Sequence, residues 1–315
     1  MSAEYPQFLG CASALIPWMD DERVTDILIN GPGVLYVEAS GRLERHESPF
    51  KDRSAILDFV ERMLTPLGRR IDAACPFADG ALQDGSRFHV ILPPLATHGP
   101  CISIRKLKAV DKLTLEAFGT RELVAWLRQQ IRQRKNLLVA GGTGAGKTTL
   151  LSLLLNEVSA GERITVIEES REICTSHPHV VSLEGRPATP DGKGAVSLRT
   201  LMRNALRMRP DRIVVGECRG EEAFDMLQAM STGHRGSLGT VHANHTRDGL
   251  KRLEVLSLLS GIGLSSQAAR EWVGGAVESV VHLCREGTRR WIREAVEVQG
   301  LEGEVYRLLP RFRVE

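Results

Sequence analysis

The feature that most constrains this chain is the segment GGTGAGKT at residues 141–148, which fits the pattern GxxxxGK[ST] at every fixed position. A compact apolar run, Asn136–Ala140, comes before it, and a leucine-rich helical pattern, Gly146–Ser159, comes after it. A loop of this kind binds phosphate when it lies between a strand and a helix. The sequence therefore predicts a phosphate-binding loop that follows a buried strand.

Each residue type in this loop has a chemical reason. Glycines let backbone N–H groups turn inward around a polyphosphate, where a Cβ would clash. We expect Lys147 to reach the β- and γ-phosphates and Thr148 to present its hydroxyl to Mg²⁺. The predicted ligands are ATP and Mg²⁺, and the predicted contacts are Gly142, Thr143, Gly144, Ala145, Gly146, Lys147, Thr148 and Thr149.

Alternating strand and helix patterns continue beyond the loop. Strands are expected at Arg163–Glu168, Arg212–Val215 and Gly236–His242, and helices at Leu198–Met208 and Glu221–Met230, and the segment Leu250–Ala276 is expected to be helical. Apolar strands joined by helices predict a parallel sheet and the α/β fold class. Gly, Pro and charge come together in Gly185–Ala195, which predicts a mobile loop, and a hairpin is expected around Glu286-Gly287.

ATP hydrolysis needs one carboxylate near Mg²⁺ and another that orients water. Glu217 follows the strand Arg212–Val215, and Glu168 and Glu169 end the strand Arg163–Glu168. We expect both strands to lie beside the strand that precedes the loop. Their carboxylates would then face one crevice at the carboxyl ends of the strands. Without the phosphate-binding loop, each of these carboxylates could equally well belong to a solvent-exposed loop residue with no catalytic role.

Two histidines fall near predicted strand ends. His242 ends the strand Gly236–His242, and His234 lies in the preceding turn. A lone histidine at a strand end is usually structural. We expect both at the same edge of the sheet, where either could sense the γ-phosphate.

Arginines recur at every fourth residue along one predicted helix. Arg199, Arg203 and Arg207 would line one face of it. Two explanations are structural: the arginines could form a solvent-exposed face, or they could pair with Asp and Glu. Three are functional: a subunit interface, a phosphate finger in trans or nucleic-acid binding. Arg219, two residues after Glu217, is a further candidate.

The first 110 residues or so have a different pattern, typical of a small α+β domain. Strands are expected at Thr25–Asn30, Val34–Glu38, Arg42–Arg45, Arg87–Leu92 and Cys101–Arg105, with a helix at Arg53–Leu64. Lys106–Thr120 is charged and loosely patterned, as a linker would be. We therefore expect domains at residues 1–106 and 121–315, joined by residues 107–120.

Composition narrows the function. There are 41 Lys and Arg residues against 39 Asp and Glu, and a net charge of +2 excludes a strongly basic, nucleic-acid-binding chain as a whole. The six cysteines include no CxxC pair and are expected to be reduced thiols. No run approaches the roughly 18 apolar residues of a spanning helix, and the start lacks the basic residues of a signal peptide. We therefore expect a cytoplasmic protein.

Several segments together resemble a known family, the ATPases of type II and type IV secretion, and most closely their Tad/Flp-pilus branch (the CpaF/TadA type). They include VTDILINGP from Val24, LQDGSRFHVILPPLA from Leu82, NLLVAGGTGAGKTTLL from Asn136 and RITVIEESREI from Arg163. The most specific is LRTLMRNALRMRPDRIVVGECRGEEAFDMLQAMSTGHRGSLGTVHAN from Leu198. The resemblance implies a RecA-like P-loop NTPase domain with a smaller α+β, PAS-like N-terminal domain.

The resemblance also implies roles for single residues. Residues 141–148 match the Walker A loop, Glu217 the Walker B glutamate and His242 the histidine of the His box. Glu168 takes the position proposed to polarise the attacking water, and Arg105 that of a first-domain arginine that reaches the nucleotide. Glu169 departs from the family pattern, because an Asp is usual at its position.

Family members work as hexameric rings that hold ATP between the two domains. Their domain motions drive pilus assembly or protein secretion through an inner-membrane platform protein. The resemblance thus implies a homo-hexameric ATPase at the cytoplasmic face of the inner membrane, held there by partners and without direct nucleic-acid contact. The alternatives are a RecA-like motor stimulated by nucleic acid, as in conjugation or a helicase, and a nucleotide-gated scaffold that hydrolyses little.

Overall fold

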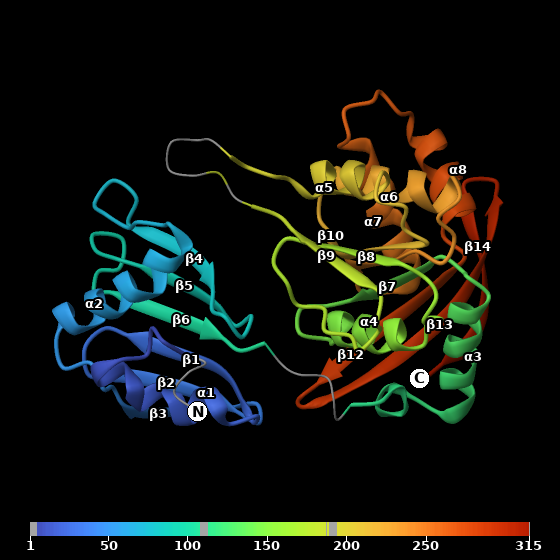
Figure 1. Ribbon diagram of the computed structural model, residues 1–315. Helices are drawn as coiled ribbons and strands as arrows, with labels where there is room; N and C mark the ends of the chain where they lie inside the picture. The colour runs from blue at the N-terminus through green and yellow to red at the C-terminus, as the bar shows by residue number, and fades with distance from the viewer. Residues whose placement is uncertain (1–4, 108–112, 187, 189–193, 315) are drawn as a thin grey trace. The chain divides into compact units, whose positions relative to one another are not determined.

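The computed structural model describes residues 5–107, 113–186, 188 and 194–314. The chain divides into two compact units, Met1–Ala109 and Val110–Glu315, and each has its own sheet and its own core (Figure 1). None of the described helices is long and apolar enough to cross a membrane. The six cysteines are free thiols.

The first unit is an antiparallel sheet in the order β3-β2-β1-β6-β5-β4. Its strands are β1 (Val24–Asn30), β2 (Val34–Ala39), β3 (Arg42–Glu47), β4 (Phe77–Ala81), β5 (Arg87–Ile91) and β6 (Cys101–Arg105). Its helices are η1 (Gly10–Leu15), α1 (Ile16–Asp20), α2 (Arg53–Leu64) and η2 (Thr65–Leu67). Alternate strand residues such as Ile27 and Ile29 pack with Phe59 of α2 in one core.

The sequence pattern does not predict β4, because Asp79 and Gly80 are poor strand formers. The strand forms because Gly80 leaves room for a neighbouring ring. A Cβ on Gly80 would lie 2.3 Å from Cζ of Phe88, its partner residue on β5. Packing against an aromatic side chain therefore outweighs the weak local preference.

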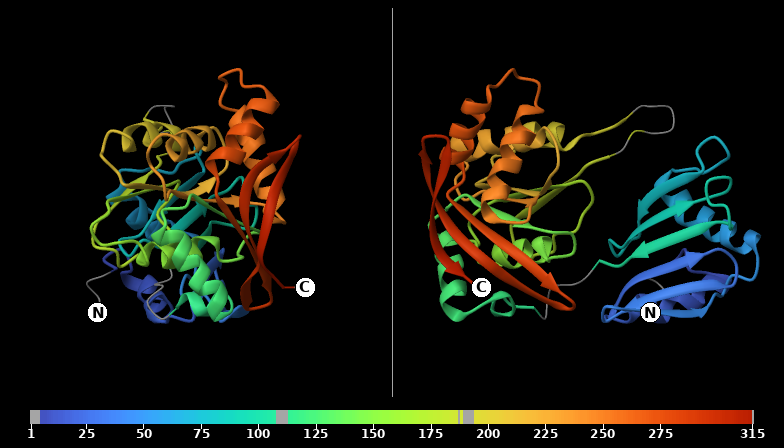
Figure 2. Two further views of the ribbon diagram at one scale, coloured as in Figure 1. Left: turned by 90° about the vertical axis from the view of Figure 1, so that its right-hand side faces the viewer. Right: turned by 180° about the vertical axis from the view of Figure 1, so that it is seen from behind.

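The second unit is a mixed sheet in the order β14-β13-β12-β7-β11-β10-β8-β9. Its strands are β7 (Leu137–Gly141), β8 (Ile164–Glu168), β9 (Val180–Glu184), β10 (Arg212–Cys218), β11 (Leu238–His242), β12 (Ser279–Glu286), β13 (Arg289–Glu302) and β14 (Val305–Arg313). Pairing is parallel from β12 to β9, and β13 and β14 add an antiparallel meander along one side (Figure 2). The predicted α/β fold with a parallel sheet is confirmed.

Helices cover both faces of this sheet. They are η3 (Leu115–Phe118), α3 (Arg121–Arg132), α4 (Lys147–Asn156), α5 (Leu198–Ala205), α6 (Glu222–Ser231), α7 (Thr246–Leu258) and α8 (Ser266–Ala276). Leu137 and Val139 of β7 pack with η3, α3 and α4, while Leu138 and Ala140 pack against the face that carries α5 to α8. The run of apolar residues in β7 is thus the mark of a strand buried on both faces.

One expectation about this unit is wrong. The strands β8 and β10 do not lie beside β7, because β11 pairs with β7 on one side and β12 on the other. The segment Leu250–Ala276, expected to be helical, contains most of α7 and all of α8, with a turn between them. Gly261 and Gly263, in the turn after α7, have φ angles of +73° and +74°, which do not continue a right-handed helix, and Ser265 caps α8 by accepting the Ala268 N–H. The loop predicted at Gly185–Ala195 lies largely outside the described residues.

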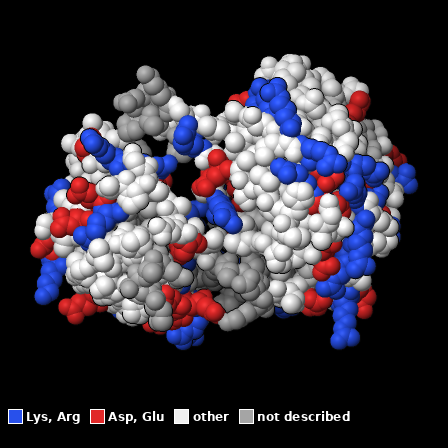
Figure 3. All heavy atoms as spheres, viewed as in Figure 1, with Lys and Arg blue, Asp and Glu red and all other residues white. Residues whose placement is uncertain are grey.

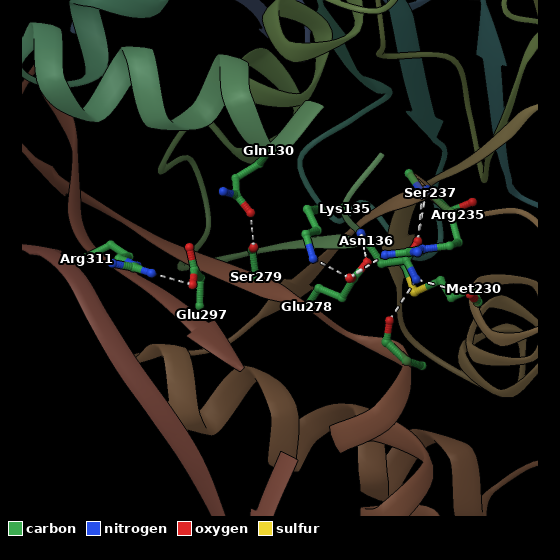
Figure 4. Close-up of polar contacts among 12 residues, drawn as sticks. Gln130, Lys135, Asn136, Met230, Arg235, Ser237, Glu278, Ser279, Glu297 and Arg311 are labelled. Carbon is green, nitrogen blue, oxygen red and sulfur yellow. Dashed lines mark hydrogen bonds and ion pairs between the residues drawn. The ribbon is translucent and has the colours of Figure 1, made fainter. Parts of the chain in front are cut away.

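A buried asparagine ties four elements together at the amino end of β7 (Figure 4). Asn136 donates through Nδ2 to the carbonyls of Met230, at the end of α6, and Ala276, at the end of α8. Its Oδ1 accepts the backbone N–H groups of Gly236 and Ser237 before β11. This amide uses all four of its hydrogen-bonding positions, so it fixes the relative position of these elements.

Candidate functional site

The loop at residues 141–148 joins the end of β7 to the start of α4. Gly144 and Gly146 have φ angles of +68° and +95°, which favour glycine over any residue with a side chain. A Cβ on Gly142 would meet no atom within 4 Å, so the space in front of this residue is open. The N-terminus of α4 follows the loop directly, as phosphate binding requires.

Lys147 is almost fully buried, at 9% exposure. Its Nζ donates to the carbonyl oxygens of Gly141 and Gly142, each at 3.0 Å. Burial lowers the pKa of Lys147, while the negative charges of Glu217 and Glu172 act in the opposite direction. A buried ammonium group held mainly by neutral carbonyls is well suited to accept an anion.

The loop after β8 brings a carboxylate to Thr148. Thr148 Oγ1 donates to Oε2 of Glu172 at 3.1 Å. The loop folds back because Oε1 of Glu168 accepts the backbone N–H groups of Glu172 and Ile173, each at 3.0 Å. Glu168 is 4% exposed, and Gly216 on β10 makes room for it, since a Cβ there would lie 2.7 Å from its Cγ.

Sequence reasoning did not select Glu172. Its only signal is the acidic cluster Glu168, Glu169 and Glu172, and nothing in that spacing indicates which carboxylate returns to the loop. The fold-back that decides it depends on the two backbone N–H groups bound by Glu168.

Arg219 joins two of the predicted acidic residues. Its guanidinium contacts Oε2 of Glu217 through Nε at 2.9 Å, and Oε2 of Glu169 at 2.8 Å. Glu217 is close enough to Lys147 to affect its pKa, and so is Arg219. Lys147, Glu217, Arg219 and Glu169 therefore belong to one cluster with Thr148 and Glu172 at the carboxyl edge of the sheet.

The two histidines lie at opposite edges. His242 is exposed and pairs in register with Gly141, so it lies directly beside the start of the loop. His234 precedes β11, whose first residue Leu238 pairs with the first residue of β7, and its carbonyl accepts from Ser237 Oγ. The expectation that both histidines share one edge is wrong, because β11 separates them along its length.

The arginine pattern is largely explained by internal ion pairs. Arg199 contacts Glu221 and also Asp225, the latter at 3.0 Å from Nε. Arg203 contacts Asp225 at 3.4 Å and stays 60% exposed. Arg207 is exposed and lies beyond α5, which ends at Ala205. The three therefore do not line one helix face, because the helix stops after the second of them.

Arg105 lies at the end of β6 in the first unit. Its Nε donates to Oδ1 of Asp26 on β1 at 3.0 Å, and its side chain is 74% exposed. The guanidinium is thus tethered within its own unit yet remains accessible.

The cluster also has the donors that Mg²⁺ and a nucleotide would need. The open space at Gly142, the ammonium group of Lys147 and the N-terminus of α4 suit a polyphosphate. Among the described residues, no three His, Cys, Asp or Glu side chains form a metal site by themselves.

The chain is similar to known proteins over most of its length. The model of the family described as "Type II/IV secretion system protein" matches residues 12–295. A putative conjugal transfer protein of Mycobacterium tuberculosis (strain ATCC 25618 / H37Rv) is 40% identical over 305 residues, which cover 93% of this chain and 86% of that protein.

Solved structures are similar as well. The crystal structure of the VirB11 ATPase from the Brucella suis type IV secretion system, in complex with sulphate, is 26% identical with a TM-score of 0.50 and covers 94% of this chain and 97% of that one. The Legionella pneumophila ATPase DotB has a TM-score of 0.64 at 20% identity, over 90% of this chain and 80% of that one, and this likeness concerns the fold alone.

Proposed function

We propose that this chain, which belongs to the family of type II/IV secretion system proteins, is an ATP-hydrolysing motor whose chemistry takes place at the loop of residues 141–148. Its fold is a RecA-like P-loop domain preceded by a smaller N-terminal domain. The observation that carries the proposal is the cluster around Lys147, where Thr148, Glu217 and Glu172 meet the phosphate-binding loop.

The contacts suggest how the residues divide the work. Lys147 would exchange the carbonyls of Gly141 and Gly142 for the β- and γ-phosphates of ATP. Thr148 would hold Mg²⁺ through its hydroxyl, and Glu217 would hold it through water. Mg²⁺ supplies charge neutralisation on the transferring phosphate.

Glu168 and His242 would act on the γ-phosphate side. The carboxylate of Glu168 is fixed by two backbone N–H groups, and a fixed acceptor can orient the attacking water. His242 would report the γ-phosphate from its place beside Gly141. From the resemblance we also propose that Arg105 contacts the nucleotide.

The cellular role follows from the family. We propose a homo-hexamer that works at the cytoplasmic face of the inner membrane. It would act on a platform protein of a pilus or secretion machine, in the Tad/Flp-pilus branch. The conjugal-transfer and VirB11 names of the relatives support a secretion role in this wider sense.

Removing the charge of Lys147 or that of Glu217 tests the proposal. We expect Lys147→Ala and Glu217→Gln to abolish phosphate release from ATP, because one loses the phosphate ligand and the other the metal-side carboxylate. Lys251→Ala, which changes an exposed lysine on α7, and Glu286→Gln, at the exposed last residue of β12, are matched controls expected to keep normal turnover. Normal turnover in Lys147→Ala or Glu217→Gln would refute the assignment.

A further inference from the structure

The carboxylates of Glu169 and Glu217 lie at the ends of two neighbouring parallel strands. Val215 on β10 pairs in register with Ile167 on β8, and each of the two glutamates comes two residues later in its own segment. Neither side chain is buried, since Glu169 is 68% and Glu217 29% exposed. Two carboxylates held close together repel each other unless a cation lies between them.

Arg219 supplies that cation. Its Nε donates to Oε2 of Glu217 at 2.9 Å, and one of its terminal nitrogens donates to Oε2 of Glu169 at 2.8 Å. Because the guanidinium group is planar and rigid, two of its N–H groups can bridge two carboxylates and fix the distance between them. The same side chain thus holds the end of β10 and the loop after β8 in one arrangement.

The backbone of Arg219 is itself anchored. Its N–H group donates to Oε1 of Glu222 at 2.6 Å, and the N–H group of Gly220 donates to the same oxygen at 2.8 Å. Glu222 lies in the first turn of α6 and is only 7% exposed. Exposed ion pairs between flexible side chains usually contribute little. Here a buried acceptor fixes the chain where the arginine side chain begins, so the bridge can position what it binds.

The charges of this bridge also act on the phosphate-binding loop. Burial lowers the pKa of Arg219, but its hydrogen bond to Glu217 and the charges of the nearby carboxylates outweigh this effect and raise the pKa above its usual value. Burial lowers the pKa of Lys147, Glu217 raises it, and Arg219 lowers it. The arginine and the carboxylate that it holds are therefore in electrostatic contact with the lysine of the loop.

We propose that Arg219 and Glu169 form a positioning pair for Glu217, in which Glu169 acts only through Arg219 and is not itself a metal ligand. Both contacts that Arg219 makes with Glu217 are to Oε2, so Oε1 is the oxygen left for the metal side. The inference rests on the proposed function, in which Glu217 holds Mg²⁺ through water. It gives Glu169 a role that its place at the end of a strand does not indicate.

Turnover of the full chain in single and double variants tests the pair. We expect Arg219→Ala and Glu169→Ala each to lower kcat about tenfold, the size of one charge-assisted hydrogen bond. Because both act through one bridge, the double variant should also lose about tenfold rather than about a hundredfold. Arg311→Ala is the matched control, because it breaks an exposed pair with Glu297 of the same 2.8 Å length and should leave kcat unchanged.

Two results of this experiment contradict the proposal. Normal turnover in both single variants would mean that the bridge positions nothing. A loss in the double variant near the product of the two single losses would mean that Glu169 acts independently of Arg219, as a direct ligand would.

ADP binding with and without Mg²⁺ gives a measurement that does not depend on turnover. Calorimetry yields the factor by which Mg²⁺ tightens ADP binding, and we expect Arg219→Ala to lower this factor. Metal-free ADP binding should stay within about threefold, since exposed charges contribute little. Glu217→Gln should lower the factor too, and adding Arg219→Ala to it should lower it no further. A larger factor in Arg219→Ala would show that the arginine competes with the metal, and the positioning role would be refuted.

The Arg219→Lys variant keeps the charge and loses the planar fork. An ammonium group is a point charge and does not bridge two carboxylates in the geometry of a guanidinium group. We therefore expect kcat of Arg219→Lys to stay close to that of Arg219→Ala. Full recovery by lysine would mean that charge alone matters, which overturns the proposal.

A Lys147→Ala variant shows which of the two claims fails. Loss of ADP binding in Lys147→Ala, together with independent effects of Arg219→Ala and Glu169→Ala, refutes only the positioning pair. Normal ADP binding in Lys147→Ala refutes the nucleotide site itself, and the pair fails with it. Thermal unfolding checks that the Arg219 and Glu169 variants fold, and we expect their unfolding temperatures to stay within about 2 °C of the unchanged protein, because the ion pair is exposed.

Discussion

At the scale of a single residue, Lys147 is held in an unfavourable charged state that a bound anion would relieve. Its ammonium group is buried, and its hydrogen bonds go to two carbonyls that carry no net charge. The protonated form is therefore less favourable in the folded protein than in water, which is the meaning of its lowered pKa. A polyphosphate would remove this cost, so part of the binding free energy comes from relief of an unfavourable state.

This reasoning predicts that Lys147→Met stabilises the protein when no nucleotide is added. We expect an unfolding temperature about 2–4 °C higher at neutral pH, since a gain near 1 kcal/mol shifts a unit of this size by that much. The buried charge costs its full amount below the lowered pKa, and the cost disappears as the pH rises through that pKa toward the ordinary 10.5. The advantage of the variant should therefore shrink with rising pH.

Thermal unfolding at several alkaline pH values measures the effect. Lys251→Met serves as the control, because Lys251 is exposed and its replacement should leave both the unfolding temperature and its pH dependence unchanged. A Lys147→Met variant less stable than the unchanged protein would show that the two carbonyl contacts outweigh the cost of burial.

Some residues of the cluster could be predicted from the sequence, and others could not. Lys147 and Thr148 occupy fixed positions of a local pattern, so the chain itself determines where they lie. A fold-back of the chain brings Glu172 to the loop, and the strand register of the β12–β13 hairpin brings Arg285 and Arg290 there. The fold-back and the hairpin are local, but each reaches the loop only through sheet pairing between segments far apart in the sequence, and no local spacing encodes that pairing.

At the scale of elements, the parallel sheet could be predicted, whereas its strand order could not. Each buried strand has an apolar run of its own, so its existence is a local property. The place of β11 between β7 and β10 is not a local property, because it depends on where the connections cross the sheet. The carboxylates after β8 and β10 still lie at the same edge as the loop, since all these strands run parallel.

Asn136 is the element-scale test, because it holds α6, α8 and β11 to the start of β7 (Figure 4). We expect Asn136→Ala to lower the free energy of unfolding of the second unit by about 3–5 kcal/mol, since buried donors and acceptors lose their partners. Urea unfolding measures it. Asn204→Ala is the control, because its amide makes an exposed contact with the Thr200 carbonyl and should cost less than about 0.5 kcal/mol. A loss below 1 kcal/mol in Asn136→Ala would mean that water replaces the amide.

At the scale of the whole molecule, the charge distribution bears on the nucleic-acid alternative. The net charge is +2, and many arginines form ion pairs within the chain. Figure 3 shows basic side chains gathered along the edge of the second unit that carries α3, β13 and β14. Two of the arginines there have acidic partners, since Arg128 contacts Glu157 and Arg311 contacts Glu297, each at 2.8 Å. Paired cations are weak ligands for a phosphate backbone.

We therefore predict that DNA does not stimulate the ATPase. With single- or double-stranded DNA at near-physiological salt, turnover should stay within about twofold of the rate without DNA, because a DNA-binding protein typically makes about 6–10 phosphate contacts with free cations. The informative variant is Arg203→Glu combined with Arg207→Glu, which reverses two exposed charges and leaves the Arg199 pairs in place. The prediction fails if three results occur together: DNA stimulates turnover, added salt removes that stimulation steeply, and the double variant abolishes it. Those three results together would make a nucleic-acid motor the better account, with the exposed arginines as its contact surface.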